Sequence, residues 1–93
     1  MELDINKVQS SLRIKGFVEF REGDHIRYVY YYNGLETSIW TCVSHHSSNI
    51  KEPLINKMKR QLKLTKNDFI NLVRCPFTKE MLQKFYEDNN YLT

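Results

Sequence analysis

The sequence predicts an α+β domain in which three consecutive antiparallel strands form a sheet with helices on one face. Two observations lead to this fold class. The segments FVEFRE, HIRYVYYY and LETSIWTCVS are rich in β-branched and aromatic residues, whereas apolar residues recur at helical spacing before and after them. A chain of 93 residues is long enough for one modest core, so residues 1–93 are expected to form a single domain.

The first helix is expected to start after Asp4, which is a suitable N-cap. Ile5, Val8 and Leu12 recur at the i, i+3, i+7 spacing of one helical face. Gly16 stands where a helix commonly ends in a left-handed residue. These features predict an amphipathic helix of about ten residues.

Three strands are expected to follow, at residues 17–22, 25–32 and 35–44. Asn33-Gly34 is a strong hairpin signal, because both positions of a type I′ turn need a positive φ. A two-residue turn fixes the register of the hairpin. The expected cross-strand pairs are Tyr32–Leu35, Tyr31–Glu36, Tyr30–Thr37, Val29–Ser38, Tyr28–Ile39, Arg27–Trp40, Ile26–Thr41 and His25–Cys42.

This register gives the hairpin two different faces. The more apolar face is expected to pack under the helices and carries Ile26, Tyr28, Tyr30, Tyr32, Leu35, Ile39 and Val43. The opposite face presents His25, Arg27, Tyr31 and Trp40. We expect this second face to be exposed, with burial under the C-terminal helices as the alternative. An exposed Arg, Trp and Tyr can stack on unpaired bases, and Arg27 over Trp40 is a favourable cation–π pair.

Three helical segments are expected after the strands. The apolar stripe of the first is formed by Leu54, Ile55, Met58 and Leu62, and Pro53 is tolerated in its first turn. A Thr-x-x-Asp pattern at residues 65–68 resembles a capping box and opens the second segment. Thr78 starts the last one. The expected order is therefore α-β-β-β-α with extra C-terminal helices.

Positive charge is concentrated in residues 51–66, where Glu52 is the one acidic residue. The basic residues of this segment are Lys51, Lys57, Lys59, Arg60, Lys63 and Lys66. Such a run favours a polyanion or an acidic protein as partner, and a solvated helix face is the alternative. We assign phosphate contacts on RNA to Lys57, Lys59, Arg60 and Lys63.

Membrane, secreted and metal-binding classes are disfavoured. No apolar run approaches the roughly 18 residues of a membrane span, and the N-terminus lacks the pattern of a signal peptide. No membrane partner is therefore expected, and the expected compartment is the cytoplasm. Cys42 and Cys75 match no metal spacing, which predicts reduced buried thiols. His25 and His46 lack further ligands, so no metal site is expected.

His25 is the candidate for chemistry because it opens a strand on the same face as Arg27 and Trp40. A histidine that titrates near neutrality can take a proton from a ribose 2′-hydroxyl or return one to a leaving oxygen. This chemistry requires no metal and no cofactor. His46 faces the same side if the third strand continues, and we count it with Arg27, Tyr31 and Trp40 among the RNA-binding side chains.

Short motifs in the chain resemble the HicA family of small toxins from type II toxin–antitoxin systems. The matching motifs are Lys15-Gly16-Phe17, Gly23-Asp24-His25 and Val43-Ser44-His45-His46, followed by the segment from Ile50 to Phe69. The resemblance covers about residues 5–70. It implies a double-stranded-RNA-binding-like α-β-β-β-α fold. It also implies an mRNA interferase that cleaves through one essential histidine of a Gly-Ser-His motif, with a HicB-type antitoxin as partner.

His25 takes the catalytic role in this resemblance. Asp24 stands where the family has a serine, Ser44 stands where a proline is common, and residues 75–93 extend past the usual end of the family. A non-catalytic RNA-binding module on the same fold is the alternative function. A third function, docking of a protein partner on the Trp40 face, also stays open. Metal-independent RNA cleavage distinguishes the first function, and salt-sensitive RNA binding without cleavage distinguishes the second.

Overall fold

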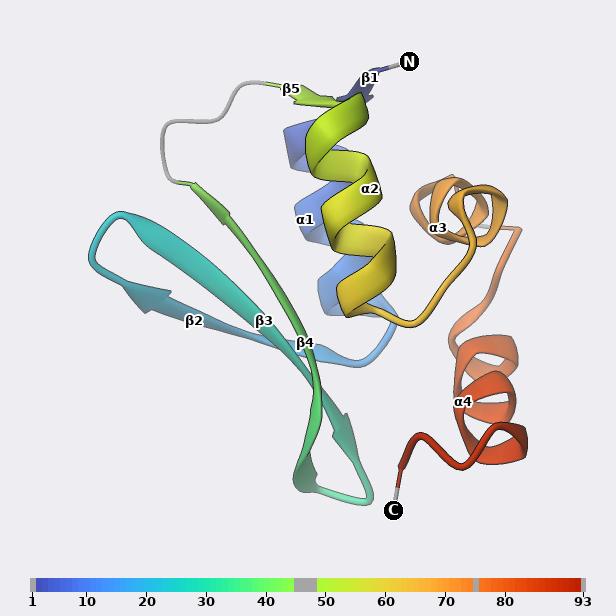
Figure 1. The fold of residues 1–93 in the computed structure, drawn as a ribbon. Helices are drawn as coiled ribbons and strands as arrows, with labels where there is room; N and C mark the ends of the chain where they lie inside the picture. The colour runs from blue at the N-terminus through green and yellow to red at the C-terminus, as the bar shows by residue number, and fades with distance from the viewer. Residues whose placement is uncertain (1, 45–48, 75, 93) are drawn as a thin grey trace.

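A computed structural model of the chain describes residues 2–44, 49–74 and 76–92 (Figure 1). A short strand and a helix precede three consecutive strands, and a second short strand leads into three helices. In chain order the elements are β1 (Glu2–Asp4), α1 (Ile5–Ile14), β2 (Phe17–Glu22), β3 (His25–Tyr32), β4 (Leu35–Ser44), β5 (Asn49–Lys51), α2 (Glu52–Gln61), α3 (Lys66–Val73) and α4 (Lys79–Asp88). The α+β class and the three long strands are confirmed.

Strands β2, β3 and β4 form an antiparallel sheet with β3 in the centre, and the helices lie on one side of it (Figure 1). The side chains of this covered face are buried with those of the helices. Its buried members are Phe17, Ile26, Tyr28, Tyr30, Ile39, Thr41 and Val43. Helix α2 adds Ile55 and Met58 to the core, and α1 adds Val8 and Leu12.

Two short strands differ from the predicted order. Strand β1 precedes the first helix, and it pairs antiparallel with β5 so that Leu3 faces Ile50. Both residues are buried. This two-stranded sheet leads directly into α1 and α2, so it ties the starts of the two helices together (Figure 1). Segments of three residues carry too little periodicity to be predicted from sequence.

The register predicted for the β3–β4 hairpin is right at its tip and wrong beyond it. Tyr32–Leu35 and Tyr31–Glu36 pair as predicted, but an irregularity then places three β4 residues opposite Tyr30. The remaining pairs are shifted by two residues, giving Val29–Trp40, Tyr28–Thr41, Arg27–Cys42, Ile26–Val43 and His25–Ser44. Because the shift is even, every side chain keeps its predicted face.

Thr37 explains the irregularity. Its hydroxyl donates a 2.6 Å hydrogen bond to the Tyr30 carbonyl and accepts one of 3.2 Å from the Ile39 amide. A side chain thus takes the place of ladder bonds, as in a β-bulge. Leu35 was expected under the helices, but it is 71% exposed because it lies at the hairpin tip.

Helix α4 covers the end of the sheet next to that tip. Tyr86 is fully buried and makes an edge contact with Tyr30, at 5.0 Å between ring centroids. The Tyr32 hydroxyl donates a 2.6 Å hydrogen bond to Glu87. Residues of the C-terminal extension therefore belong to the core, whereas Met81 on the outer side of α4 is half exposed.

The helix starts follow the predicted capping residues. Asp4 accepts a 2.8 Å hydrogen bond from the Asn6 amide, and the Thr65 and Thr78 hydroxyls accept bonds from the amides of Asp68 and Met81. Pro53 lies in the first turn of α2, as expected. These bonds satisfy amides that have no partner within their helices.

Candidate functional site

His25 lies at the start of β3, directly after a two-residue turn. In that turn Gly23 has a φ of 60°, whereas the φ of Asp24 is not positive. This combination is typical of a type II′ hairpin. His25 pairs with Glu22 on one side and Ser44 on the other. Its side chain is exposed and belongs to the face opposite the core. The turn and the alternation of the strand therefore aim His25 at solvent, as predicted.

The face of the sheet opposite the helices, which we call the open face, carries a stack of aromatic and basic side chains. The Arg27 guanidinium lies 5.6 Å from the Phe20 ring centroid and 5.8 Å from that of Trp40. Glu22 forms a 3.2 Å ion pair with Arg27. Trp40 is 40% exposed, so the prediction that this face is uncovered is confirmed for Trp40. Tyr31 is half-buried against Phe20, at 6.4 Å between ring centroids.

The open face is packed as well as exposed. Val29 lies in the centre of β3 and is only 1% exposed, between its cross-strand partners Val18 and Trp40. The Arg27 Nε is buried without a hydrogen-bond partner among the residues that the structure describes, and the guanidinium lies near the rings of Phe20 and Trp40. Arg27 and Trp40 therefore form a pre-ordered surface that is suited to stacking on a planar group.

A groove runs beside His25 along the outer edge of β4. It has a volume of about 200 Å³ and is lined by His25, Cys42, Val43, Ser44, Leu54 and Lys57. We call it the histidine groove. Typical small-molecule sites measure about 300–1,000 Å³, so this groove is better matched to one phosphodiester group than to a whole nucleotide.

The structure separates Lys57 from the other predicted phosphate contacts. Lys57 is exposed and lines the histidine groove. Lys59 is half-buried, and Arg60 and Lys63 are exposed, but none of these three lines the groove. Arg60 donates its Nε–H to the Asn56 carbonyl at 3.2 Å. The site thus has one lysine next to the histidine and further positive charge along the same helix.

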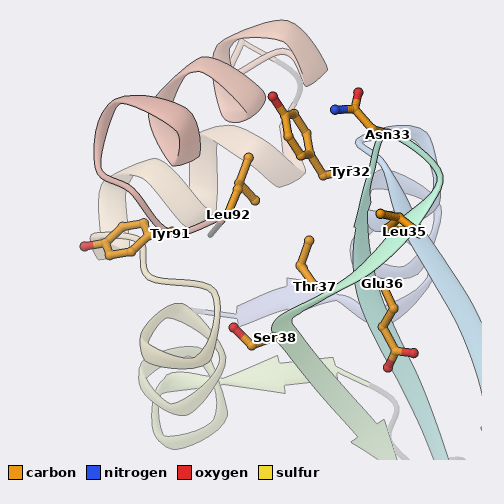
Figure 2. Close-up of a pocket in the computed structure, with 8 residues that line it drawn as sticks. All are labelled: Tyr32, Asn33, Leu35, Glu36, Thr37, Ser38, Tyr91 and Leu92. Atoms are coloured by element: carbon orange, nitrogen blue, oxygen red, sulfur yellow. The ribbon is translucent and has the colours of Figure 1, made fainter.

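A larger hollow than the histidine groove lies at the other end of the sheet (Figure 2). It has a volume of about 380 Å³ and is formed by the hairpin tip and the C-terminal tail. Tyr91 and Leu92 of the tail line it together with residues of the hairpin, and the Leu92 side chain points toward Tyr32 (Figure 2). Because His25 is at the opposite end of β3 from this tip, the hollow is not part of the histidine site.

Two predicted features need correction, and two predicted residues lie outside the described part of the chain. Cys42 was expected to be a buried thiol, but it is half-buried and borders the histidine groove. The shifted register makes it, and not Trp40, the cross-strand partner of Arg27. His46 and Cys75 lie outside the described residues.

Phe20 is the functional candidate that sequence reasoning missed. It is the β2 partner of Arg27 and provides the second ring against its guanidinium. The two-residue turn at Gly23-Asp24 contained this information, since pairing Glu22 with His25 places Phe20 opposite Arg27.

No family model, curated protein or solved structure matches this chain. Within the described ranges, no three His, Cys, Asp or Glu side chains come together as a metal site would require. None of the helices described is both long enough and apolar enough to cross a bilayer. The chemistry of His25, the histidine groove and the open face therefore indicates the function.

Proposed function

We propose that this protein is a HicA-like mRNA interferase, in which His25 acts as general acid or base on the RNA backbone. The observation that carries the proposal is the arrangement around His25. An exposed histidine lies between a groove of phosphodiester size and a surface on which bases can stack. We further infer that α1, β2, β3, β4 and α2 correspond to the double-stranded-RNA-binding-like unit that the resemblance implies.

The reaction that suits these groups is transesterification of RNA. His25 takes the proton of a ribose 2′-hydroxyl, and the 2′-oxygen forms a bond to the adjacent phosphorus. The bond from phosphorus to the 5′-oxygen then breaks, and the 5′-oxygen takes up a proton as it leaves. The products are a 2′,3′-cyclic phosphate end and a 5′-hydroxyl end, and no metal or organic cofactor takes part in these steps.

Two parts of the surface support binding of the RNA in this proposal. Arg27, Trp40, Tyr31 and Phe20 offer stacking surfaces for unpaired bases on the open face. Lys57, Lys59, Arg60 and Lys63 supply positive charge for phosphates. A HicB-type antitoxin is the protein partner that the proposed function requires, and the cytoplasm is the compartment in which mRNA would be met.

Replacement of His25 tests the proposal. Wild type is expected to cut a 2′-hydroxyl RNA in the presence of a chelator and to stop growth when expressed, whereas His25→Ala does neither and still binds RNA. Gln83→Ala, at an exposed position of α4, is the control for the substitution itself. Equal cleavage by wild type and His25→Ala would remove the histidine from the mechanism. Binding without cleavage by both proteins would favour the non-catalytic RNA-binding module.

A further inference from the structure

The histidine groove holds a second group that can carry a proton. His25 comes from β3 and Lys57 from α2, and both side chains line this same small groove. Ile55 and Met58 are buried against the core, which fixes the rotation of α2. Leu54 and Lys57, three residues apart, are neighbours on the helix surface and both border the edge of β4. The packing of α2 therefore accounts for the place of Lys57.

One histidine leaves part of the proposed reaction without a proton donor. In an in-line displacement the attacking and leaving oxygens are on opposite sides of the phosphorus. A base that faces the 2′-hydroxyl is then on the wrong side to protonate the 5′-oxygen in the same step. A second group on the far side of the phosphorus would supply this proton as the bond to the 5′-oxygen breaks.

We propose that Lys57 is a catalytic acid, which donates a proton from its ammonium group to the leaving 5′-oxygen while His25 takes the proton of the 2′-hydroxyl. This inference rests on the proposed function of the His25 site. The bond between the 2′-oxygen and phosphorus forms, the bond between phosphorus and the 5′-oxygen breaks, and one proton moves at each end. Solvent then removes the proton from the imidazolium and returns one to Lys57, so the protein is unchanged after a turnover.

The position of Lys57 distinguishes it from the other basic residues of α2. It lines the groove together with His25, Leu54 and Val43. Lys59, Arg60 and Lys63 carry the same charge but do not border the groove. They are placed to attract RNA, whereas Lys57 is placed beside the group that starts the reaction.

The leaving atom of the substrate provides the test. Two RNA oligonucleotides are compared, one with the natural 5′-oxygen at the cleaved bond and one with sulfur in its place. A thiol is a much stronger acid than an alcohol, with a pKa of about 8.5 for cysteine, so a thiolate leaves without protonation. Single-turnover cleavage is measured for wild type, Lys57→Met, Lys57→Arg, His25→Ala and Lys84→Met. Lys84, in an exposed ion pair on α4, is the matched control for loss of a lysine.

We expect Lys57→Met to slow cleavage of the oxygen substrate by about 10²–10⁴-fold and to cleave the sulfur substrate within a few-fold of wild type. Lys57→Arg keeps the charge but is a far weaker acid, so it should behave like Lys57→Met. His25→Ala should stay slow on both substrates, and Lys84→Met should match wild type. An equal loss on both substrates for Lys57→Met, or no loss, would overturn the role of Lys57 as acid. If wild type cleaves neither substrate, the proposed function itself fails.

Discussion

The Tyr86 hydroxyl donates a 2.7 Å hydrogen bond to the carbonyl oxygen of Leu62. Both residues have no exposed surface. Leu62 is the C-cap of α2, and carbonyls at the end of a helix have no partner within that helix. The bond thus satisfies a buried acceptor and attaches α4 to the helix that carries Lys57. The C-terminal extension supports the candidate site through α2, although it does not reach the site itself.

Removal of this hydroxyl should destabilise the protein. Tyr86→Phe keeps the ring contacts but leaves the Leu62 carbonyl buried without its partner, which costs about 1–3 kcal/mol. Urea unfolding monitored by circular dichroism gives the free energy of unfolding. Tyr91→Phe, on the half-buried tail, is the matched control and should lose less. Equal losses for the two variants would show that the bond to Leu62 contributes nothing to stability.

A carboxylate on β2 should make stability depend on acid pH. Glu19 accepts a 2.6 Å hydrogen bond from the Tyr28 hydroxyl and a 2.8 Å bond from Arg13. The Tyr28 bond, followed by the Arg13 guanidinium, holds the pKa of Glu19 below its ordinary value. A lowered pKa in the folded state gives stability that is present above the unfolded pKa of about 4.3 and is lost as the pH falls through the folded pKa.

Glu19→Gln should therefore flatten the acid limb of the stability profile. The free energy of unfolding, measured in urea at several pH values between about 5 and 3, should fall less steeply for this variant than for wild type. Arg13→Gln removes only one of the causes and should give an intermediate slope. A wild-type slope in Glu19→Gln would mean that this carboxylate does not couple to folding.

The sequence predicts the long elements well because each contains its own local signal. The caps Asp4, Thr65 and Thr78 and the apolar spacing of the helices are local features, and the structure confirms them. The predicted register of β3 and β4 is wrong beyond Thr37. The Thr37 hydroxyl replaces ladder hydrogen bonds there, and this depends on the tertiary structure around it. The two faces of the sheet were still right, since a shift of two residues preserves the alternation.

The candidate site was only partly predictable for a related reason. The place of His25, Arg27 and Trp40 on the open face follows from strand alternation, which is local. Lys57 and His25 line the same groove because of the way α2 packs against the edge of β4. The spacing of residues in the sequence does not predict how a helix packs against a strand. The basic run predicted positive charge on the helix but did not distinguish Lys57 from its neighbours.

The end of α2 offers a stabilising substitution. Lys63 has a φ of 62°, and its amide and that of Leu64 donate to the carbonyls of Arg60 and Lys59, as in a Schellman motif. A residue with a Cβ is strained in this left-handed conformation, and glycine is not. Lys63→Gly should stabilise the protein by about 1 kcal/mol and raise the Tm by about 4–8 °C. Lys63→Ala removes the same charge and keeps the strain, so a similar gain in both variants would contradict this explanation.

Trp40 distinguishes RNA recognition from core packing on the open face. Its ring is 40% exposed and lies 5.8 Å from the Arg27 guanidinium. If a base stacks on this ring, Trp40→Ala should weaken RNA binding by about 1–3 kcal/mol. The cost in stability should be about 1 kcal/mol, mainly the lost cation–π contact, and not the 3–5 kcal/mol of a tryptophan removed from a core.

Both quantities can be measured in a His25→Ala background, where the RNA stays intact. Fluorescence anisotropy with a labelled single-stranded RNA gives the affinity, and urea unfolding gives the stability. Ile14→Ala is the matched control, because Ile14 is an apolar residue that is 66% exposed and belongs to α1, not to the sheet. We expect Trp40→Ala to lose affinity and Ile14→Ala to keep it. A loss of several kcal/mol in stability with unchanged affinity would make Trp40 a packing residue, and the open face would then lose its part in RNA binding.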